Sequence, residues 1–483
     1  MAERLQNYID GKWTDSNASD VHVVKNPANG EILGETPLCG ADEVDAAVQA
    51  AARAFPTWRR TPVQERVQHL FRLKALLEEH AEEFAEIVTR ENGKTLDEAR
   101  GSVRRGIQMV EVACGAPTLL MGSVLEDIAG GIDCESVRQP LGVFAAICPF
   151  NFPAMVPMWF FPFAVACGNT FVCKPSEQVP FSQKLMWELI DKAGFPAGVL
   201  NLIQGGKDCV NSMLVHPDIA GISFVGSSPV AEHVYKTAAS TGKRVQALGG
   251  AKNFIFVMPD ADMDHALDSI SDSAFGCAGE RCLAASIVVP VGGCDDEVRD
   301  GLIERMKKIK IGDGHEDGVT MGPMITEAHR DKVAGYIAKG VEEGAELVVD
   351  GRTFDRADAG DAGWFLGPTL FDKVSPEMTV GKDEIFGPVL CIMPAETLDD
   401  AVKMAHDQPL ANASSIFTSS GKAARKFRYE IEASMAGVNI GVAAPMSFFG
   451  FGGAKGSFYG DLKAHGREAF DFYTDRKVVI SRW

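Results

Sequence analysis

A regular alternation of short β-rich runs with amphipathic helical stretches begins at Gly142 and restricts the fold more than any other feature. Helical spacing of apolar residues marks the stretches between the runs, such as 182–193 and 230–240. Strands that alternate with helices in this way form a parallel sheet covered on both faces. We therefore predict a doubly wound α/β domain with strands at 142–148, 169–174, 199–204, 219–226, 244–248 and 253–258.

A second alternation starts near Asp262. It comprises a strand at 286–291, a helix at 296–307 and a strand-like run at 345–351. At about 150 residues per domain, a chain of 483 residues has room for roughly three domains. We predict a second α/β unit, with a boundary between the two units near residue 250.

The first third of the chain is predicted to be helical after a short start of extended segments. Thr61, Pro62 and Gln64 resemble a capping box that opens a helix ending at Glu79. A further long helix is predicted over 96–114, with Arg104 and Arg105 at its middle. The last residues, 470–483, alternate like an exposed strand with no evident partner, which is a liability unless another element or subunit covers it, and we expect oligomerisation.

Composition narrows the function classes. The 47 Lys and Arg residues against 66 Asp and Glu residues give a net charge of −19, which disfavours nucleic acid as a partner. The 11 cysteines lack the paired CxxC spacing of a structural zinc site, so we expect no metal and a reducing compartment. The N-terminal residues show no export signal, and we predict a cytoplasmic protein.

Residues 139–173 contain no charged side chain and are numerous enough to span a bilayer. Four prolines, at 149, 153, 157 and 162, would break a continuous helix there and leave backbone groups unpaired in lipid. We therefore interpret this segment as a buried strand, a loop and a buried helix, and expect no membrane span.

Cys282 is the strongest candidate for a catalytic residue. It follows a Gly-containing turn and has Arg281 directly before it, a cationic setting that we expect to raise the thiolate fraction. Most buried cysteines are inert small hydrophobes, so the local pattern alone leaves both interpretations open. Asn151 lies between two prolines and is either an oxyanion donor or part of a structural turn.

Cofactor candidates lie where predicted strands end. No GxGxxG or P-loop motif is present. Gly226, Ser227 and Ser228 join a predicted strand to a helix, where their amides and hydroxyls could bind an anion. A plain helix cap explains these residues equally well. Lys174 and Glu177 follow another strand, at the sheet edge where open α/β folds bind ligands. A carboxylate there accepts hydrogen bonds from ribose hydroxyls and repels a phosphate, which favours NAD over NADP.

The motifs at 147–153, 174–180, 223–228, 279–282 and 384–388 together resemble those of the aldehyde dehydrogenase superfamily. The resemblance implies that Cys282 is the nucleophile, and that the Asn151 amide and the Cys282 backbone N–H form the oxyanion hole. It also implies NAD as cofactor. By the same likeness the cofactor-lining positions are Cys148, Phe150, Lys174, Glu177, Gln178, Ser227, Gly249, Glu384 and Phe386.

One departure from the superfamily pattern is informative. Hydrolytic members carry a Glu in an ELGGK segment, whereas this chain has QALGGAK, with Ala247 or Leu248 at that position and no general base.

Together with the segments CPFNFPAM and GSFYGDLKAHG, the loss of this Glu resembles the CoA-acylating methylmalonate-semialdehyde dehydrogenase family. That family uses CoA as co-substrate and converts malonate or methylmalonate semialdehyde to acetyl-CoA or propionyl-CoA. Arg105 and Arg281 match its carboxylate-binding arginines.

The resemblance also implies the architecture. The expected aldehyde dehydrogenase fold has an NAD-binding domain at 1–120 and 140–250, a catalytic domain at 251–440, and a small β extension for oligomerisation at 121–139 and 456–483. The family implies a homotetramer, or at least a dimer. Two other functions stay open: a hydrolytic NAD-dependent dehydrogenase for another small aldehyde, and a catalytically silent protein on the same scaffold.

Overall fold

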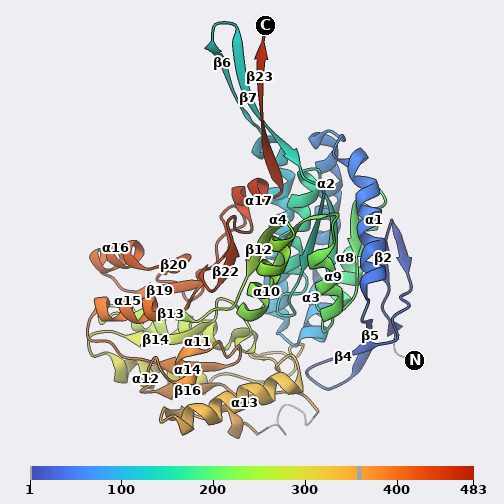
Figure 1. The fold of residues 1–483 in the computed structure, drawn as a ribbon. Coiled ribbons are helices and arrows are strands. Elements are labelled where there is room, and N and C mark those ends of the chain that lie inside the picture. Colours follow the sequence, from blue (N-terminus) through green and yellow to red (C-terminus); the bar gives the residue numbers. More distant parts are fainter. Residues whose placement is uncertain (1–2, 356–361) are drawn as a thin grey trace.

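The computed structural model describes residues 3–355 and 362–483, and it has a mixed α/β architecture built on two large sheets (Figure 1). The strand order of the first sheet is β22-β12-β11-β8-β9-β10-β2-β3. In that order the strands are Phe458–Gly460, Arg244–Leu248, Ile219–Val225, Val143–Ile147, Thr170–Lys174, Leu200–Leu202, Asn7–Ile9 and Lys12–Thr14. β8 to β12 pair in parallel, whereas β2, β3 and β22 join the two edges as antiparallel strands.

Both faces of the first sheet are covered by helices. Successive residues of β8 point to opposite faces, since Val143 and Ala145 belong to one buried cluster and Phe144 and Ala146 to another. The face that carries Val143 and Ala145 packs against α1, α9 and α10, which are Ala41–Trp58, Lys207–Val215 and Ser228–Ser240. The second packs against α2, α3, α4, α7 and α8, which are Val63–Glu79, Ala81–Asn92, Leu96–Cys114, Phe161–Ala166 and Phe181–Lys192. The predicted doubly wound arrangement is confirmed, but the placement of the run at 253–258 in this unit is wrong, because Asn253–Val257 pairs within the second sheet.

The second sheet has the order β15-β16-β17-β14-β13-β19-β20. Its strands in that order are Glu346–Val349, Thr369–Asp372, Val389–Ile392, Ala285–Pro290, Asn253–Val257, Ala413–Phe417 and Met435–Val438. All of them pair in parallel except β15, which is antiparallel to β16. The accompanying helices are α11 (Met263–Phe275), α12 (Asp295–Met306), α13 (Glu327–Glu342), α14 (Thr379–Lys382), α15 (Leu398–Asp407) and α16 (Gly421–Glu430).

A narrow three-stranded extension projects from the body of the molecule and carries the C-terminus at its tip (Figure 1). It consists of β6 (Ser123–Ala129), β7 (Ile132–Pro140) and β23 (Thr474–Arg482). The expectation that the C-terminal strand begins at Phe470 is wrong, and the strand is covered by another element of the chain. Residues Gly466–Phe472 form helix α17, and β23 pairs with β7 along its whole length. A short apolar run at a spacing of two residues fits either a strand or a buried helical turn, and here packing of Phe470 and Phe472 in the core decides.

The remaining elements are short. Two small sheets are formed by β1 (Glu3–Arg4), β5 (Ile32–Pro37) and β4 (Val21–Lys25), and by β18 (Leu410–Ala411) and β21 (Ala454–Lys455). The short helices are α5 (Ala116–Leu119) and α6 (Met155–Met158). The uncharged segment 139–173 folds as β8, α6, α7 and the buried strand β9. Within the described ranges, no helix is both long and apolar enough to cross a membrane.

Candidate active site

The Cys282 loop connects α11 to β14 through a strained turn. Cys277 and Ala278 have φ values of 50° and 52°, a left-handed conformation that side chains with a Cβ rarely adopt, and Gly279 follows at 72°. The carboxylate of Glu98 on α4 accepts a hydrogen bond of 2.6 Å from the Cys277 backbone N–H. The surrounding structure therefore holds a turn that the local sequence would not maintain alone.

Two asparagine side chains hold the backbone at Cys282. The carbonyl oxygen of Cys282 accepts hydrogen bonds from the Nδ2 atoms of Asn253, at 3.0 Å, and Asn412, at 3.1 Å. Asn253 Nδ2 also donates to the carbonyl of Ala284, and its Oδ1 accepts from the backbone N–H of Ala413. The loop is thus fixed from β13 and from the start of β19. Sequence reasoning missed both asparagines, because their partners are backbone groups distant in the chain.

Asn151 lies against the same loop. Its Nδ2 donates a hydrogen bond of 3.0 Å to the carbonyl oxygen of Glu280, two residues before Cys282, and the side chain is buried. A primary amide has two N–H donors, so the second remains for another acceptor. The backbone carbonyl of Asn151 accepts a hydrogen bond of 2.6 Å from Lys94 Nζ. The structure therefore brings together the two residues to which sequence reasoning assigned the chemistry.

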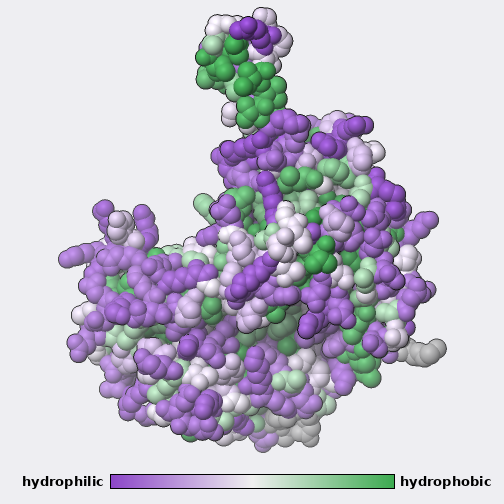
Figure 2. All heavy atoms as spheres, viewed as in Figure 1, coloured by the Kyte–Doolittle hydropathy of each residue, from purple (hydrophilic) through white to green (hydrophobic). Residues whose placement is uncertain are grey.

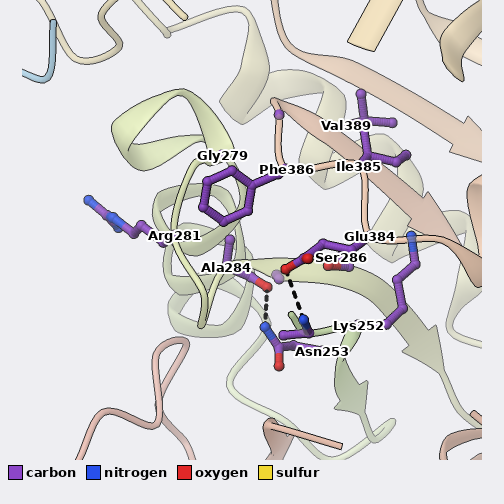
Figure 3. A pocket seen from close by; sticks show the side chains of 13 residues that line it. Lys252, Asn253, Gly279, Arg281, Ala284, Ser286, Glu384, Ile385, Phe386 and Val389 are labelled. Atoms are coloured by element: carbon purple, nitrogen blue, oxygen red, sulfur yellow. Dashed lines mark hydrogen bonds between the residues drawn. The ribbon is translucent and has the colours of Figure 1, made fainter. Parts of the chain in front are cut away.

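The expectation of a cationic setting for the Cys282 thiol is wrong. Burial raises the pKa of Cys282 to about 12, the negative charge of Glu384 acts in the same direction, and the charge of Arg281 opposes it weakly. The Arg281 guanidinium extends away from Glu384 (Figure 3). It pairs with Glu98 at 2.8 Å, and its Nε donates to Cys277 Sγ at 3.2 Å. Adjacency in sequence did not predict adjacency in space at this turn.

Glu384 lies at the edge of a small cavity of about 20 Å³ that also borders Lys252, Arg281 and Phe386 (Figure 3). The backbone N–H of Ala251 donates to Glu384 Oε1 at 2.8 Å, and burial raises the pKa of the carboxyl group to about 7. A Cβ on Gly250 would lie 2.1 Å from Glu384 Oε2, so only glycine permits this close approach.

Phe386 and Phe150 meet next to this cavity. Phe386 has a φ of 59°, and its carbonyl accepts a hydrogen bond of 2.7 Å from His329 Nε2. The rings of Phe150 and Phe386 pack edge to face with 5.8 Å between centroids. Two of the predicted cofactor-lining residues, from distant parts of the chain, are therefore in contact.

A second group of predicted cofactor residues lies at the carboxyl end of β9. Lys174 Nζ is buried and lies 3.2 Å from Glu177 Oε2, while its other hydrogen bonds go to the carbonyls of Pro175 and Gly205. The Cys148 backbone N–H donates to the Lys174 carbonyl. The buried Oε1 of Gln178 has no hydrogen-bond partner within the described residues. Such an orphaned acceptor is available to a ligand donor.

Ser227 and Gly249 lie together at the N-terminus of α10. Ser227 is the N-cap residue, but its hydroxyl makes no capping bond, so backbone N–H groups at this helix end are open to an anion. The next residue, Ser228, accepts from the Gly250 N–H at 2.9 Å and donates to the carbonyl of Gly456 at 2.9 Å. A Cβ on Gly249 would meet that carbonyl and the Ser228 hydroxyl, both at 3.0 Å.

The two predicted carboxylate-binding arginines differ. Arg281 is engaged by Glu98 in an ion pair whose side chains are 21% and 15% exposed. Arg105, on α4, is half-buried, and it makes no hydrogen bond or ion pair with any residue that the structure describes. Only Arg105 therefore presents an uncompensated guanidinium.

Residues 13–479 match the family model "Aldehyde dehydrogenase family". The chain belongs to the aldehyde dehydrogenase family. It is 54% identical over 481 residues to malonate-semialdehyde dehydrogenase 2 of Geobacillus kaustophilus, with 100% of this chain and 99% of the relative covered. It is 50% identical to malonate-semialdehyde dehydrogenase of Halalkalibacterium halodurans, with the same coverage.

Solved structures agree with this family assignment. A crystal structure from Sinorhizobium meliloti 1021, described as a methylmalonate-semialdehyde dehydrogenase complexed with NAD, superposes with a TM-score of 0.98 at 42% identity and covers 100% of this chain and 98% of that one. The methylmalonate-semialdehyde dehydrogenase of Oceanimonas doudoroffii gives 0.97 at 44% identity, with 100% and 99% covered. The predicted aldehyde dehydrogenase fold is confirmed.

Proposed function

We propose that this protein is an NAD-dependent, CoA-acylating dehydrogenase that oxidises and decarboxylates malonate or methylmalonate semialdehyde to acetyl-CoA or propionyl-CoA. The observation that carries the proposal is the convergence of Asn151 on the Cys282 loop, because a nucleophile and a neighbouring amide donor are what carbonyl addition needs. The unpaired guanidinium of Arg105 supports a substrate with a carboxylate.

In this mechanism, the Cys282 thiol loses its proton to solvent, its Sγ attacks the aldehyde carbon, and the electron pair of the C=O bond moves onto the oxygen. The Asn151 Nδ2 and the Cys282 backbone N–H donate to that oxyanion. NAD, when bound, would supply the acceptor for the hydride that leaves the carbon. Expulsion of hydride restores the C=O bond and leaves a thioester on Cys282. The β-carboxyl group then departs as CO2, since the thioester carbonyl accepts its electron pair, and a proton takes its place.

NAD fits the residues present. The Glu177 carboxylate is 34% exposed at the end of β9, and the open N–H groups of α10 lie at Ser227. Gln178 offers an orphaned acceptor, and Glu384 with Phe386 borders the small cavity. We propose that Glu177 binds the ribose hydroxyls and that the N-terminus of α10 binds phosphate. Glu384 and Phe386 would hold the nicotinamide end. The walls of the cofactor site would be formed by Cys148, Phe150, Lys174 and Gly249.

CoA is proposed as the acyl acceptor because the position of a hydrolytic base is apolar. Ala247 and Leu248 are both buried, in β12, and neither side chain can take a proton from water. A thiol is a better nucleophile than water and needs less assistance. Slow hydrolysis would then keep the thioester available until CoA arrives.

The assembly is proposed to be a cytoplasmic homotetramer. Apolar side chains gather on the projecting extension (Figure 2), where Val124 is 69% exposed and Ile480 is 66% exposed. Exposed apolar strands of this kind are favourable sites for contact with another subunit, which buries them. We propose that segments 121–139 and 456–483 join subunits, while 1–120 with 140–250 binds NAD and 251–440 carries the nucleophile. The solution mass from light scattering tests the number of subunits.

The catalytic proposal is tested by NADH formation from malonate semialdehyde and from methylmalonate semialdehyde, each with and without CoA. We expect steady turnover only with CoA, and a single burst of NADH per active subunit without it. Cys282→Ser is expected to abolish both the burst and turnover. An equal steady rate without CoA would contradict the proposal and favour the hydrolytic alternative.

A further inference from the structure

Three polar groups without hydrogen-bond partners belong to one region of the structure. Both ring nitrogens of His465 and the indole Nε1 of Trp159 are buried and make no hydrogen bond within the described residues. The guanidinium of Arg105 likewise has no ion pair or hydrogen bond there. Buried polar groups are normally paired, so such a cluster calls for an explanation.

The packing brings these groups together from three elements. Trp159 directly follows α6, and His465 directly precedes α17. Their rings meet edge to face with 4.6 Å between centroids, and Phe451 packs against both rings at 4.5 and 5.4 Å. Arg105 lies on α4, and a Cβ on its neighbour Gly106 would be only 2.1 Å from the Met158 methyl group at the end of α6.

The charges of this cluster are not balanced. Burial lowers the pKa of His465 to about 3, and the positive charge of Arg105 acts in the same direction. His465 is therefore neutral at physiological pH, with one ring nitrogen as a donor and the other as an acceptor. No carboxylate pairs with Arg105 within the described residues. An anion with at least two oxygens would satisfy the guanidinium and the imidazole N–H together.

The conformation of His465 adds to this argument. Its φ is 72°, in the left-handed region that bulky side chains rarely adopt. A strained backbone, a buried ring and two unpaired nitrogens each cost stability. Strained residues of this kind cluster at ligand sites, where the surrounding structure maintains them.

The cluster is also connected to the reaction centre. Asn151 and Trp159 belong to the same uncharged segment, in which α6 begins four residues after Asn151. Cys282 packs against the same buried cluster that contains Trp159 and Phe451. The inference therefore requires that a short substrate whose carbonyl lies at Cys282 and Asn151 has its other end at this cluster.

We propose that His465 is a substrate-binding residue that determines specificity, donating a ring N–H hydrogen bond to the substrate carboxylate that Arg105 neutralises. The inference rests on the proposed function, because it requires an aldehyde that carries a carboxylate. Trp159 offers its indole N–H to the same carboxylate and forms the wall against which the imidazole ring packs. The ligand class is a short aldehyde with a terminal carboxylate.

The test compares malonate semialdehyde with propanal, which has the same number of carbons and no carboxylate. In His465→Ala, kcat/KM for malonate semialdehyde is expected to fall about tenfold to a hundredfold, the range for a hydrogen bond to a charged group, while propanal changes less than about twofold. His465→Asn keeps an N–H donor and tolerates a positive φ, so it should restore most of the loss. His233→Asn, at an exposed position on α10, is the matched control and should alter neither substrate.

An equal loss for both substrates in His465→Ala, or no loss for either, would overturn the inference. If the wild-type enzyme has equal kcat/KM values for propanal and malonate semialdehyde, the proposed function itself fails, which is a different result. Should His465→Ala not fold, malonate serves as a competitive carboxylate probe of the wild-type enzyme. The ring nitrogen signals of His465, identified by their absence in His465→Asn, should shift when inhibition by malonate saturates, and unchanged signals would overturn the inference.

Discussion

The side-chain ammonium of Lys94 donates a hydrogen bond of 2.6 Å to the backbone carbonyl of Asn151, and both residues are buried. The same nitrogen lies 3.9 Å from the centre of the Phe152 ring. Burial of a cation is costly unless it is paired and hydrogen-bonded. Lys94 thus fixes the backbone at the proposed oxyanion residue, from a position that no sequence motif drew attention to.

Replacement of Lys94 should displace the oxyanion donor. We expect Lys94→Met, which keeps an apolar chain of similar length, to lower kcat about a hundredfold with little change in KM, since a small misplacement of a reacting group has this effect. The control is Lys184→Met, which removes an exposed lysine paired with Glu3. Steady-state kinetics on folded protein would contradict the positioning role if kcat were unchanged or only KM rose.

The thiol of Cys282 should become more reactive when Glu384 loses its charge. Glu384 is half ionised near pH 7, and its negative charge raises the pKa of Cys282. Glu384→Gln removes that charge above pH 7, so the thiolate fraction at a given alkaline pH should rise on the order of a few-fold. The rate of iodoacetamide labelling between pH 7 and 10 measures this effect. The control is Glu396→Gln, at an exposed position. A labelling rate of Glu384→Gln equal to or below that of the wild type would count against the coupling between Glu384 and Cys282.

Stability should fall at alkaline pH because of Glu280. Burial raises the pKa of this carboxyl group to about 8, so the folded state binds its proton more tightly than the unfolded chain does. This contribution is fully present below about pH 4.5 and is lost as pH rises through about 8. Glu280→Gln stays neutral and should be more stable than the wild type at pH 9, by about 1.4 kcal/mol for each unit of pKa shift at most. Chemical denaturation of both proteins at pH 6 and pH 9 tests this prediction. A difference in unfolding free energy between Glu280→Gln and the wild type that does not change with pH would refute it.

Glu177 should select NAD over NADP. Its carboxylate is 34% exposed at the end of β9, where it would repel a phosphate on the ribose. Glu177→Gln keeps the shape and removes the charge, so the ratio of kcat/KM for NAD to that for NADP should fall about tenfold. Measurement of both cofactors with one aldehyde tests the prediction. An unchanged ratio would place the selectivity elsewhere.

Much of the fold could be predicted because periodic patterns reflect burial. The helix predicted over 96–114 coincides with α4, whose apolar spacing matches its buried face. The start of α2 was placed wrongly, since the helix begins at Val63 with Pro62 as its N-cap residue, and the Thr61 hydroxyl donates to the Thr57 carbonyl rather than capping the helix. A proline next to a threonine allows both arrangements, and the preceding helix decides.

The candidate site could be predicted only in part. Cys282 and Asn151 lie in distinctive motifs, whereas Lys94, Asn253 and His465 take their places through backbone contacts or packing that tertiary structure creates. The direction of Arg281 depends on the left-handed turn at 277–279, which no pattern of residue types indicates. Local sequence therefore identifies reactive groups better than it identifies the groups that orient them.

The central claim is tested most directly by trapping the acyl group on Cys282. The enzyme is mixed with malonate semialdehyde and NAD in the absence of CoA, quenched in acid and analysed by peptide mass spectrometry. We predict an acetyl group on the peptide that contains Cys282, which disappears when CoA is added before the quench. An unmodified Cys282 peptide after one equivalent of NADH has formed would contradict the account.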